Sequence, residues 1–282
     1  MLICTTPTEM HSACRDLHAS ANTLGLVPTM GALHAGHLSL FATARAECHI
    51  VAASIFVNPI QFSPGEDYES YPRTLDEDCR KLESAGVQIL FAPSAAGMFP
   101  PGNTTFVDPG EIATRLDGAS RPGHFRGVAT IVTRLFHIVA PDRAYFGQKD
   151  AAQVAVLRHI VRDLNLPVHI AVCPIVREPD GLALSSRNRN LTPEERARAL
   201  ILSRALATAE SLARKGESHT EILHSAILTV LSTDPNLRLD YAAIVDPDTL
   251  LPIANTTQGA LIAVAAWVGQ TRLIDNLILA AR

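Results

Sequence analysis

Two histidines, His34 and His37, stand three residues apart in the stretch LVPTMGALHAGHLSLF. The apolar run before them predicts a buried strand, and the pattern after them predicts a helix that begins near Gly36. A helix N-terminus offers unpaired N–H groups and the positive end of the helix dipole, and both favour a phosphate. Two imidazoles could add hydrogen bonds to charge developing on that phosphate. Ordinary polar residues at a helix start are an open alternative, whereas a metal pair is disfavoured because no carboxylate or third histidine stands nearby.

A lysine follows a second predicted junction of strand, turn and helix, in the stretch DRAYFGQKDAAQ. Lys149 can reach a phosphate as a mobile point charge, and Asp150 is a good N-cap for the helix that follows. The alternative is a solvated surface lysine.

Two hydroxyls and a guanidinium follow one another in the stretch REPDGLALSSRNRN, at Ser185, Ser186 and Arg187. This segment is too rich in glycine and charge to be a strand, so it predicts a loop. The loop could bind phosphate, or its serines could simply cap the backbone of their own turn.

Alternating strands and helices are predicted from residue 24 to about 175. Short runs rich in β-branched and aromatic residues predict buried parallel strands at 24–28, 49–57, 87–93, 142–147 and 167–175. Amphipathic segments predict helices at 37–48, 74–86, 127–140 and 150–165, with Gly86 as a C-cap. This order predicts an α/β domain with a parallel sheet of the Rossmann type, which binds ligands where the strand order reverses.

A second and smaller α+β domain is predicted after a hinge near residue 176. Thr192, Pro193 and Glu195 predict the start of a long helix that ends near Lys215, and a second helix is predicted at 219–231. The runs 237–247, 259–269 and 271–279 are separated by loops too short for a helical crossover, so they predict an antiparallel three-stranded sheet. The predicted domains are therefore 1–175 and 176–282.

The composition excludes several classes of protein. The 282 residues include 24 basic and 28 acidic ones, which gives a formal net charge of −4 and no broad attraction to nucleic acid or to an anionic bilayer. Five cysteines without a C-x-x-C pair argue against a disulfide framework or a zinc knuckle and fit a reducing cytoplasm. Neither a signal peptide nor an apolar run of roughly 20 residues is found. We therefore expect a cytoplasmic protein with small-molecule partners.

Several of these stretches resemble known motifs. HAGH resembles the HIGH motif of the nucleotidyltransferase superfamily, and LSSR resembles its KMSKS-type loop. Over nearly all of the chain, VPTMGALHAGHLSL, FVNPIQF, YPRTLDEDC, HFRGVATIV, PDRAYFGQKDAAQ and VREPDGLALSSRNRNL are similar, in this order, to the pantothenate synthetase family. The resemblance implies a homodimer with a Rossmann-type domain, a C-terminal lid, ATP and Mg²⁺. It also implies a reaction of coenzyme A biosynthesis, the condensation of pantoate with β-alanine through a pantoyl adenylate.

The resemblance also implies roles for single residues. The residues it assigns to the ATP phosphates are His34, His37, Lys149, Ser185, Ser186 and Arg187. It places Met30, Gln61 and Gln153 around pantoate. The residues expected around the nucleotide are Gly36, Gly147, Asp150, Val176, Leu184 and also Met30. Leu184 replaces the methionine that is usual in the family, and we expect little effect because the two side chains are nearly isosteric. The Mg²⁺ ligands are left undetermined: Asp78 and Glu77 are candidates, and a solvated helix face explains them as well.

Two alternative functions share part of this pattern. Another HIGH-motif nucleotidyltransferase would share HAGH but has no reason to carry FVNPIQF or the second-domain pattern. A non-catalytic nucleotide-binding regulatory module would have no need for both histidines, Lys149 and a complete SSRN loop together.

Overall fold

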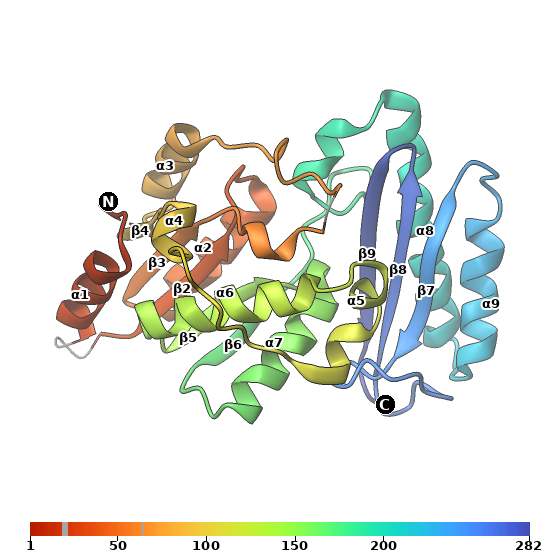
Figure 1. Cartoon of the computed structure of the whole chain (residues 1–282). Coiled ribbons are helices and arrows are strands. Elements are labelled where there is room, and N and C mark those ends of the chain that lie inside the picture. Colours follow the sequence, from red (N-terminus) through yellow and green to blue (C-terminus); the bar gives the residue numbers. More distant parts are fainter. Residues whose placement is uncertain (19–21, 64) are drawn as a thin grey trace. The chain divides into compact units, whose positions relative to one another are not determined.

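The computed structural model describes residues 1–18, 22–63 and 65–282 (Figure 1). Its contacts divide the chain into two compact units. Unit 1 comprises Met1–Thr114, Arg121–Gly147 and Val156–Cys173, and unit 2 comprises Arg115–Ser120, Gln148–Ala155 and Pro174–Arg282. The domains 1–175 and 176–282 stay a prediction. Within the first of them, the segments 115–120 and 148–155 and the last two residues, 174 and 175, belong to unit 2 by their contacts.

Unit 1 is built on a parallel sheet of six strands, in the order β1-β4-β3-β2-β5-β6 among the described residues. Its strands are β1 Leu2–Cys4, β2 Leu24–Thr29, β3 Ile50–Ile55, β4 Ile89–Phe91, β5 Arg143–Gly147 and β6 His169–Cys173. Its helical elements are α1 Pro7–His18, α2 Ala35–Glu47, η1 Pro59–Gln61, α3 Leu75–Ser84, α4 Ala95–Met98, η2 Gly110–Thr114 and α6 His124–Val139. The predicted α/β fold with a parallel Rossmann-type sheet is confirmed.

The strand order reverses at the centre of this sheet. From β2 the chain proceeds through β3 to β4 on one side, whereas β5 and β6 lie on the other side. β2 and β5 are direct neighbours, with Leu26 opposite Ala144. Their carboxyl ends lead into the two segments that carry the histidine pair and Lys149. A parallel sheet binds its ligand at such a reversal, so the topology agrees with the predicted location of the site.

Two elements near the N-terminus were not predicted, and the strands β3, β4 and β6 are shorter than predicted. β1 has only three residues, and two of them, Leu2 and Ile3, are 54% and 48% exposed, so it lacks the apolar signature of a buried strand. The helix α1 that follows it was missed as well. β4 ends at Phe91 and not at Pro93, whose backbone has no N–H group for a ladder hydrogen bond.

Unit 2 packs two long helices on an antiparallel sheet in the order β7-β8-β9, as predicted (Figure 1). Its elements are α5 Asp117–Ser120, η3 Gln148–Asp150, η4 Ser186–Asn190, α8 Pro193–Arg214, α9 Thr220–Leu231, β7 Arg238–Val245, β8 Ala260–Val268 and β9 Thr271–Leu279. Helix α7, Ala151–Asp163, begins in unit 2 and ends in unit 1. The predicted start of α8 is confirmed by a capping box, in which the Thr192 hydroxyl accepts from Glu195 N at 3.2 Å and the Glu195 carboxylate accepts from Thr192 N at 2.9 Å.

Hydrogen bonds between residues far apart in the sequence explain why the two units differ from the two domains predicted from the sequence. Arg272 of β9 binds Asp117 at 2.7 Å, and Tyr241 of β7 donates to Asp117 at 3.2 Å. These contacts draw the segment 115–120 into unit 2, although it lies far from the predicted hinge near residue 176. Burial raises the pKa of Tyr241, and the Asp117 carboxylate raises it further, so the phenol stays protonated as a donor over the physiological range. A domain boundary predicted from composition has no access to such pairs.

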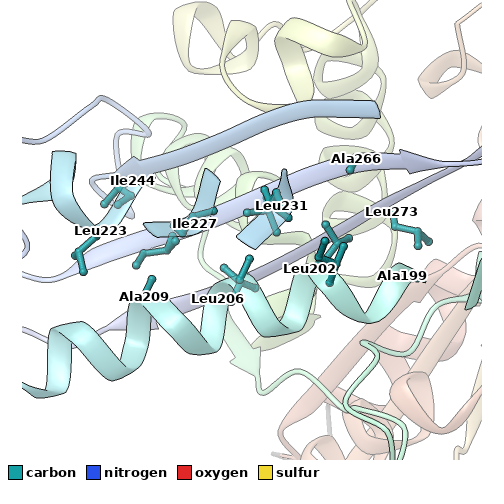
Figure 2. Close-up of a cluster of buried hydrophobic side chains, with 14 of the residues drawn as sticks. Ala199, Leu202, Leu206, Ala209, Leu223, Ile227, Leu231, Ile244, Ala266 and Leu273 are labelled. Carbon is teal, nitrogen blue, oxygen red and sulfur yellow. The ribbon is translucent and has the colours of Figure 1, made fainter. Parts of the chain in front are cut away.

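The core of unit 2 lies between these helices and the sheet (Figure 2). Leu202 and Leu206 of α8 face it together with Leu223 and Ile227 of α9. The residues of this cluster recur at helical spacing on each helix, which is why the amphipathic pattern predicted both helices correctly.

None of the helices among the described residues combines the length and the apolar character needed to cross a membrane.

Leu206 is 2% exposed in this core, so we expect Leu206→Ala to lower the free energy of unfolding by about 2–5 kcal/mol, because lost burial and a cavity act together. Urea denaturation measures the change. Leu228→Ala on α9 is the matched control, because Leu228 is 36% exposed and its truncation should cost much less. Equal losses for the two variants would contradict this description of the core.

Candidate active site

The two histidines form a reciprocal cap at the start of α2. His34 is the N-cap, and its Nδ1 accepts a hydrogen bond from Gly36 N at 3.1 Å, while Nδ1 of His37 accepts from His34 N at 3.3 Å. The ring centroids are 4.1 Å apart. Because both Nδ1 atoms accept, a neutral ring carries its proton on Nε2 and can donate from there. Each imidazole therefore caps the helix with one nitrogen and carries its proton on the other.

The turn before this pair is fastened by a carboxylate from α3. Asp78 is completely buried and accepts hydrogen bonds from Ala32 N at 2.9 Å, Leu33 N at 2.8 Å and the Thr74 hydroxyl at 3.0 Å. Ala32 has a left-handed backbone, with φ of 51°, which is unfavourable for alanine by itself. Lys81 adds a hydrogen bond of 2.7 Å to the carbonyl of Leu33. The position of the histidine pair thus depends on α3.

This geometry corrects one interpretation of the sequence. A solvated helix face was one explanation for Asp78 and Glu77, and it is wrong for Asp78, which is buried. Three donors already occupy the Asp78 carboxylate, so it is poorly suited to a Mg²⁺ ion as well. Glu77 is 55% exposed and pairs with Lys81 at 2.7 Å. Within the described part of the chain, no group of three His, Cys, Asp or Glu side chains could hold a metal ion.

The structure brings together two residues that were predicted to line the pantoate site, Gln61 and Met30. The Gln61 amide donates to Met30 Sδ at 3.2 Å, and its Oε1 accepts from Asn58 Nδ2 at 2.9 Å. Asn58 was missed, although it stands in the motif FVNPIQF. It is 1% exposed, and its Oδ1 has no hydrogen-bond partner among the described residues. A buried amide oxygen without a partner is costly, which makes Asn58 a further candidate for contact with a substrate.

A buried histidine holds the backbone of Gln61. His124 Nδ1 lies 2.8 Å from the Gln61 carbonyl, and Arg121 lies 3.0 Å from His124 Nε2. Arginine can only donate, so Nε2 accepts and the proton on Nδ1 is donated to the carbonyl. Arg121 also forms two hydrogen bonds of 2.7 Å to Glu66. Burial acts to raise the pKa of Glu66, but the hydrogen bond and the charge of Arg121 hold that pKa below its ordinary value.

Lys149 lies in the short helix η3 directly after β5. Its side chain is 21% exposed, and its ammonium is 3.5 Å from a carboxylate oxygen of Asp150, which is a weak contact. Asp150 directly precedes α7, and the half-buried Gln153 lies in the first turn of that helix. A Cβ added to Gly147 would meet no atom within 4 Å, so packing within the chain does not explain the glycine. Open space beside it suits a ligand.

The loop with the two serines has the cap that one interpretation predicted. Ser185 is the N-cap of η4, and its hydroxyl oxygen accepts from Arg187 N at 3.3 Å. The hydroxyl keeps its own proton for donation, so capping does not exclude binding of a phosphate. Ser186 and Arg187 begin η4. Leu184 N donates to the carbonyl of Val176 at 2.9 Å, which brings together two residues predicted to surround the nucleotide.

Arg196 of α8 fastens the start of this loop. Its guanidinium binds both carboxylate oxygens of Glu178, at 3.0 and 2.8 Å, and Asp180 at 2.7 Å. Asn188 in turn donates to Glu178 and to the carbonyl of Ala183, both at 3.0 Å. These pairings were not predicted, because a charge pattern does not reveal the partner of each charge.

A parallel sheet with a histidine pair after one central strand and a lysine after its neighbour defines a nucleotide-binding α/β enzyme. Comparisons with known proteins identify the family within this class. The family model described as Pantoate-beta-alanine ligase matches residues 2–278. A pantothenate synthetase of Koribacter versatilis (strain Ellin345) is 54% identical over 281 residues, which cover 100% of this chain and 97% of that protein. One from Thermotoga neapolitana is 52% identical and covers 99% of this chain and 100% of its own.

Solved structures agree with this. The crystal structure of pantothenate synthetase from Thermus thermophilus has a TM-score of 0.91 and 48% identity, and it covers 98% of this chain and 99% of that one. The pantoate-beta-alanine ligase from Francisella tularensis, complexed with beta-gamma ATP and beta-alanine, has a TM-score of 0.80 and 37% identity over 99% of this chain and 97% of that one. This chain belongs to the pantoate-beta-alanine ligase family. It is an enzyme of that family, and the two alternative functions are set aside.

We expect Asp78→Asn to lower both stability and turnover. The amide presents an N–H group where a backbone N–H needs an acceptor, and an unpaired buried donor costs about 1–3 kcal/mol. Urea denaturation and the rate of pyrophosphate release measure the two effects. Asp76→Asn on the exposed side of α3 is the control and should change neither. Unchanged behaviour of the Asp78 variant would show that the turn before the histidines holds its shape without this carboxylate.

Proposed function

We propose that this chain joins pantoate to β-alanine in two steps at the expense of ATP. In the first step a pantoate carboxylate oxygen attacks the α-phosphorus of ATP and pyrophosphate leaves, which gives pantoyl adenylate. In the second step the amine of β-alanine attacks the acyl carbon, AMP leaves with the bonding electron pair, and the amine loses a proton. The histidine pair at the start of α2, with Nδ1 of each ring bound to a backbone N–H, is the observation that carries this proposal.

The chemistry explains why a site of this composition suffices. A carboxylate is a poor acyl donor because its leaving group would be oxide, and adenylation replaces oxide with AMP. No side-chain nucleophile is needed, so the protein contributes mainly orientation and stabilisation of charge. Histidine, lysine, serine and arginine are suited to that task.

The ATP phosphates are assigned to hydrogen-bond donors and cationic side chains. Nε2–H of His34 and of His37 donates to phosphate oxygens, with the N–H groups of the first turn of α2 behind them. The Lys149 ammonium stabilises the negative charge that develops on the departing pyrophosphate. The remaining donors of this group are Ser185, Ser186 and Arg187.

Pantoate is assigned to neutral amides. Gln61, Gln153 and the newly identified Asn58 can match hydroxyl and carboxylate groups without burying a charge. The buried Oδ1 of Asn58 supports this, because a substrate hydroxyl would supply the donor that the oxygen needs. Met30 completes this surface beside Gln61.

The rest of the nucleotide is assigned to Gly36, Gly147, Asp150, Val176 and Leu184. Open space beside Gly147 supports its place in this set, since a side chain there would fill the room left for a ligand. Leu184 replaces a methionine by a side chain of similar volume, which supports an unchanged pocket.

Mg²⁺, a homodimer, a cytoplasmic location and closure of the 176–282 domain as a lid are proposed from the family resemblance alone. Mg²⁺ commonly keeps several waters and binds substrate phosphates with one or two carboxylates. A site without a cluster of acidic residues among the described ones fits an ion that arrives with ATP. The ion would neutralise phosphate charge during adenylation.

The two-step reaction should show its first half without the amine. With ATP, Mg²⁺ and pantoate alone, labelled pyrophosphate should exchange into ATP, and leaving out pantoate should abolish the exchange. An exchange that strictly requires β-alanine would rule out a separate adenylation step.

Lys149→Ala should lower the rate of pyrophosphate release by on the order of 10² to 10³ at saturating ATP and pantoate, the scale typical of losing one electrostatic stabiliser. Affinity for ATP should change less, because the ammonium acts mainly on charge that develops in the transition state. The melting temperature should stay near that of the parent protein. Lys215→Ala, at an exposed lysine, is the control. Near-normal turnover of the Lys149 variant would return this lysine to the solvated-surface interpretation.

A further inference from the structure

Asn276 of β9 holds the backbone that carries Lys149. Its Nδ2 donates to the carbonyl of Gln148 at 3.0 Å and to the carbonyl of Lys149 at 2.9 Å. Its Oδ1 accepts from the side-chain amide of Gln148 at 2.9 Å. Both N–H groups and the oxygen of the Asn276 amide are therefore used on η3, and the three contacts fix the orientation of the amide.

The burial of this amide makes its contacts costly to lose. Asn276 is 3% exposed in the strand segment TRLIDNLIL of β9. A buried amide is unfavourable unless it is hydrogen-bonded, so the side chain and the two carbonyls depend on each other. Hydrogen bonds to two successive carbonyls also restrict the peptide plane between Gln148 and Lys149, from which the lysine side chain departs.

The preceding residue of the same strand holds a second segment of the site. Asp275 is 3% exposed and accepts from Arg177 at 2.7 and 2.9 Å. Successive side chains of a strand point to opposite faces, so Asp275 and Asn276 act on opposite sides of β9. Arg177 also donates to the carbonyl of Gly181 at 3.1 Å, in the hairpin that leads to Ser185. β9 therefore anchors both segments of unit 2 that carry predicted phosphate contacts.

We propose that Asn276 is a positioning residue for adenylation, which acts by fixing the backbone of Lys149. The proposal rests on the role proposed above for Lys149. Misplacing a catalytic group by about 1 Å can cost on the order of 10²-fold in rate, so loss of the two carbonyl contacts should slow the chemistry much more than it weakens binding of pantoate.

The test is a double-mutant cycle between Asn276→Leu and Lys149→Ala, read as pyrophosphate release at saturating ATP and pantoate. Leucine has a similar shape but cannot donate to the carbonyls. We expect Asn276→Leu to lower kcat by about 10- to 100-fold, with KM for pantoate within roughly threefold of the parent value. In the Lys149→Ala background the same change should cost less than roughly threefold, because the group that it misplaces is already gone.

Leu273→Ala on the same strand controls for stability, because Leu273 is 5% exposed and packs in the hydrophobic core of unit 2. It should lower the melting temperature and leave kcat near the parent value, when all variants are assayed well below their melting temperatures. Asn276→Ala is a second variant, which removes the contacts and leaves room for water, and it should follow the same pattern with a smaller loss.

The outcomes separate the two proposals. A slow Lys149→Ala enzyme beside an Asn276→Leu enzyme of normal kcat overturns the positioning role alone, and so does an equal loss in both backgrounds. Normal turnover of Lys149→Ala overturns the role proposed for the lysine and, with it, this inference. Failure of both Asn276 variants to fold makes the role structural and overturns the proposal as well.

Discussion

The buried carboxylate of Asp78 fixes the turn between β2 and α2, and the histidine pair depends on that turn. Two successive N–H groups, of Ala32 and Leu33, donate to it from a backbone with φ of 51° at Ala32. Such a backbone is stable only where its surroundings enforce it. The N–H groups of this turn are occupied by the protein's own carboxylate, so they are not available to another anion. The carboxylate thereby holds the turn that leads into α2.

The same principle recurs at the other segments of the site. His124 holds the carbonyl of Gln61, and Asn276 holds the carbonyls of Gln148 and Lys149. In each case a buried polar side chain from a distant element binds the backbone of a turn. One such hydrogen bond contributes only about 1 kcal/mol to stability, but it restricts orientation. These contacts hold the polar groups of the turns in place, so the protein needs less reorganisation when charge develops during the reaction.

Most of the strands and helices could be predicted from the sequence. The side-chain hydrogen bonds that hold the turns of the candidate site could not. β2 and β5 carry continuous apolar runs, and α8 begins with a capping box, so local signals were sufficient for them. Asp78 lies in a charged helical pattern, and its hydrogen-bond partner Ala32 is 46 positions away. Asn276 lies in a strand that also carries Arg272 and Asp275, and its partner Gln148 is 128 positions away. Asn58 was within a quoted motif, but its significance depends on an unpaired oxygen that only the fold reveals.

Charge around the predicted phosphate contacts is set locally, and the net charge of −4 says little about it. Two of the carboxylates that neighbour these segments in unit 2 are bound by guanidinium groups, Glu178 by Arg196 and Asp275 by Arg177. Pairing weakens the repulsion that each carboxylate would exert on a polyanion, because the opposite charge lies within 3 Å. Lys149, in the role proposed above, can then attract a phosphate group at short range. Beyond a Debye length the excess of acidic residues contributes no such attraction. Local pairing therefore reconciles an acidic chain with a polyanionic substrate. The acidic net charge, in turn, disfavours extended polyanions such as nucleic acids.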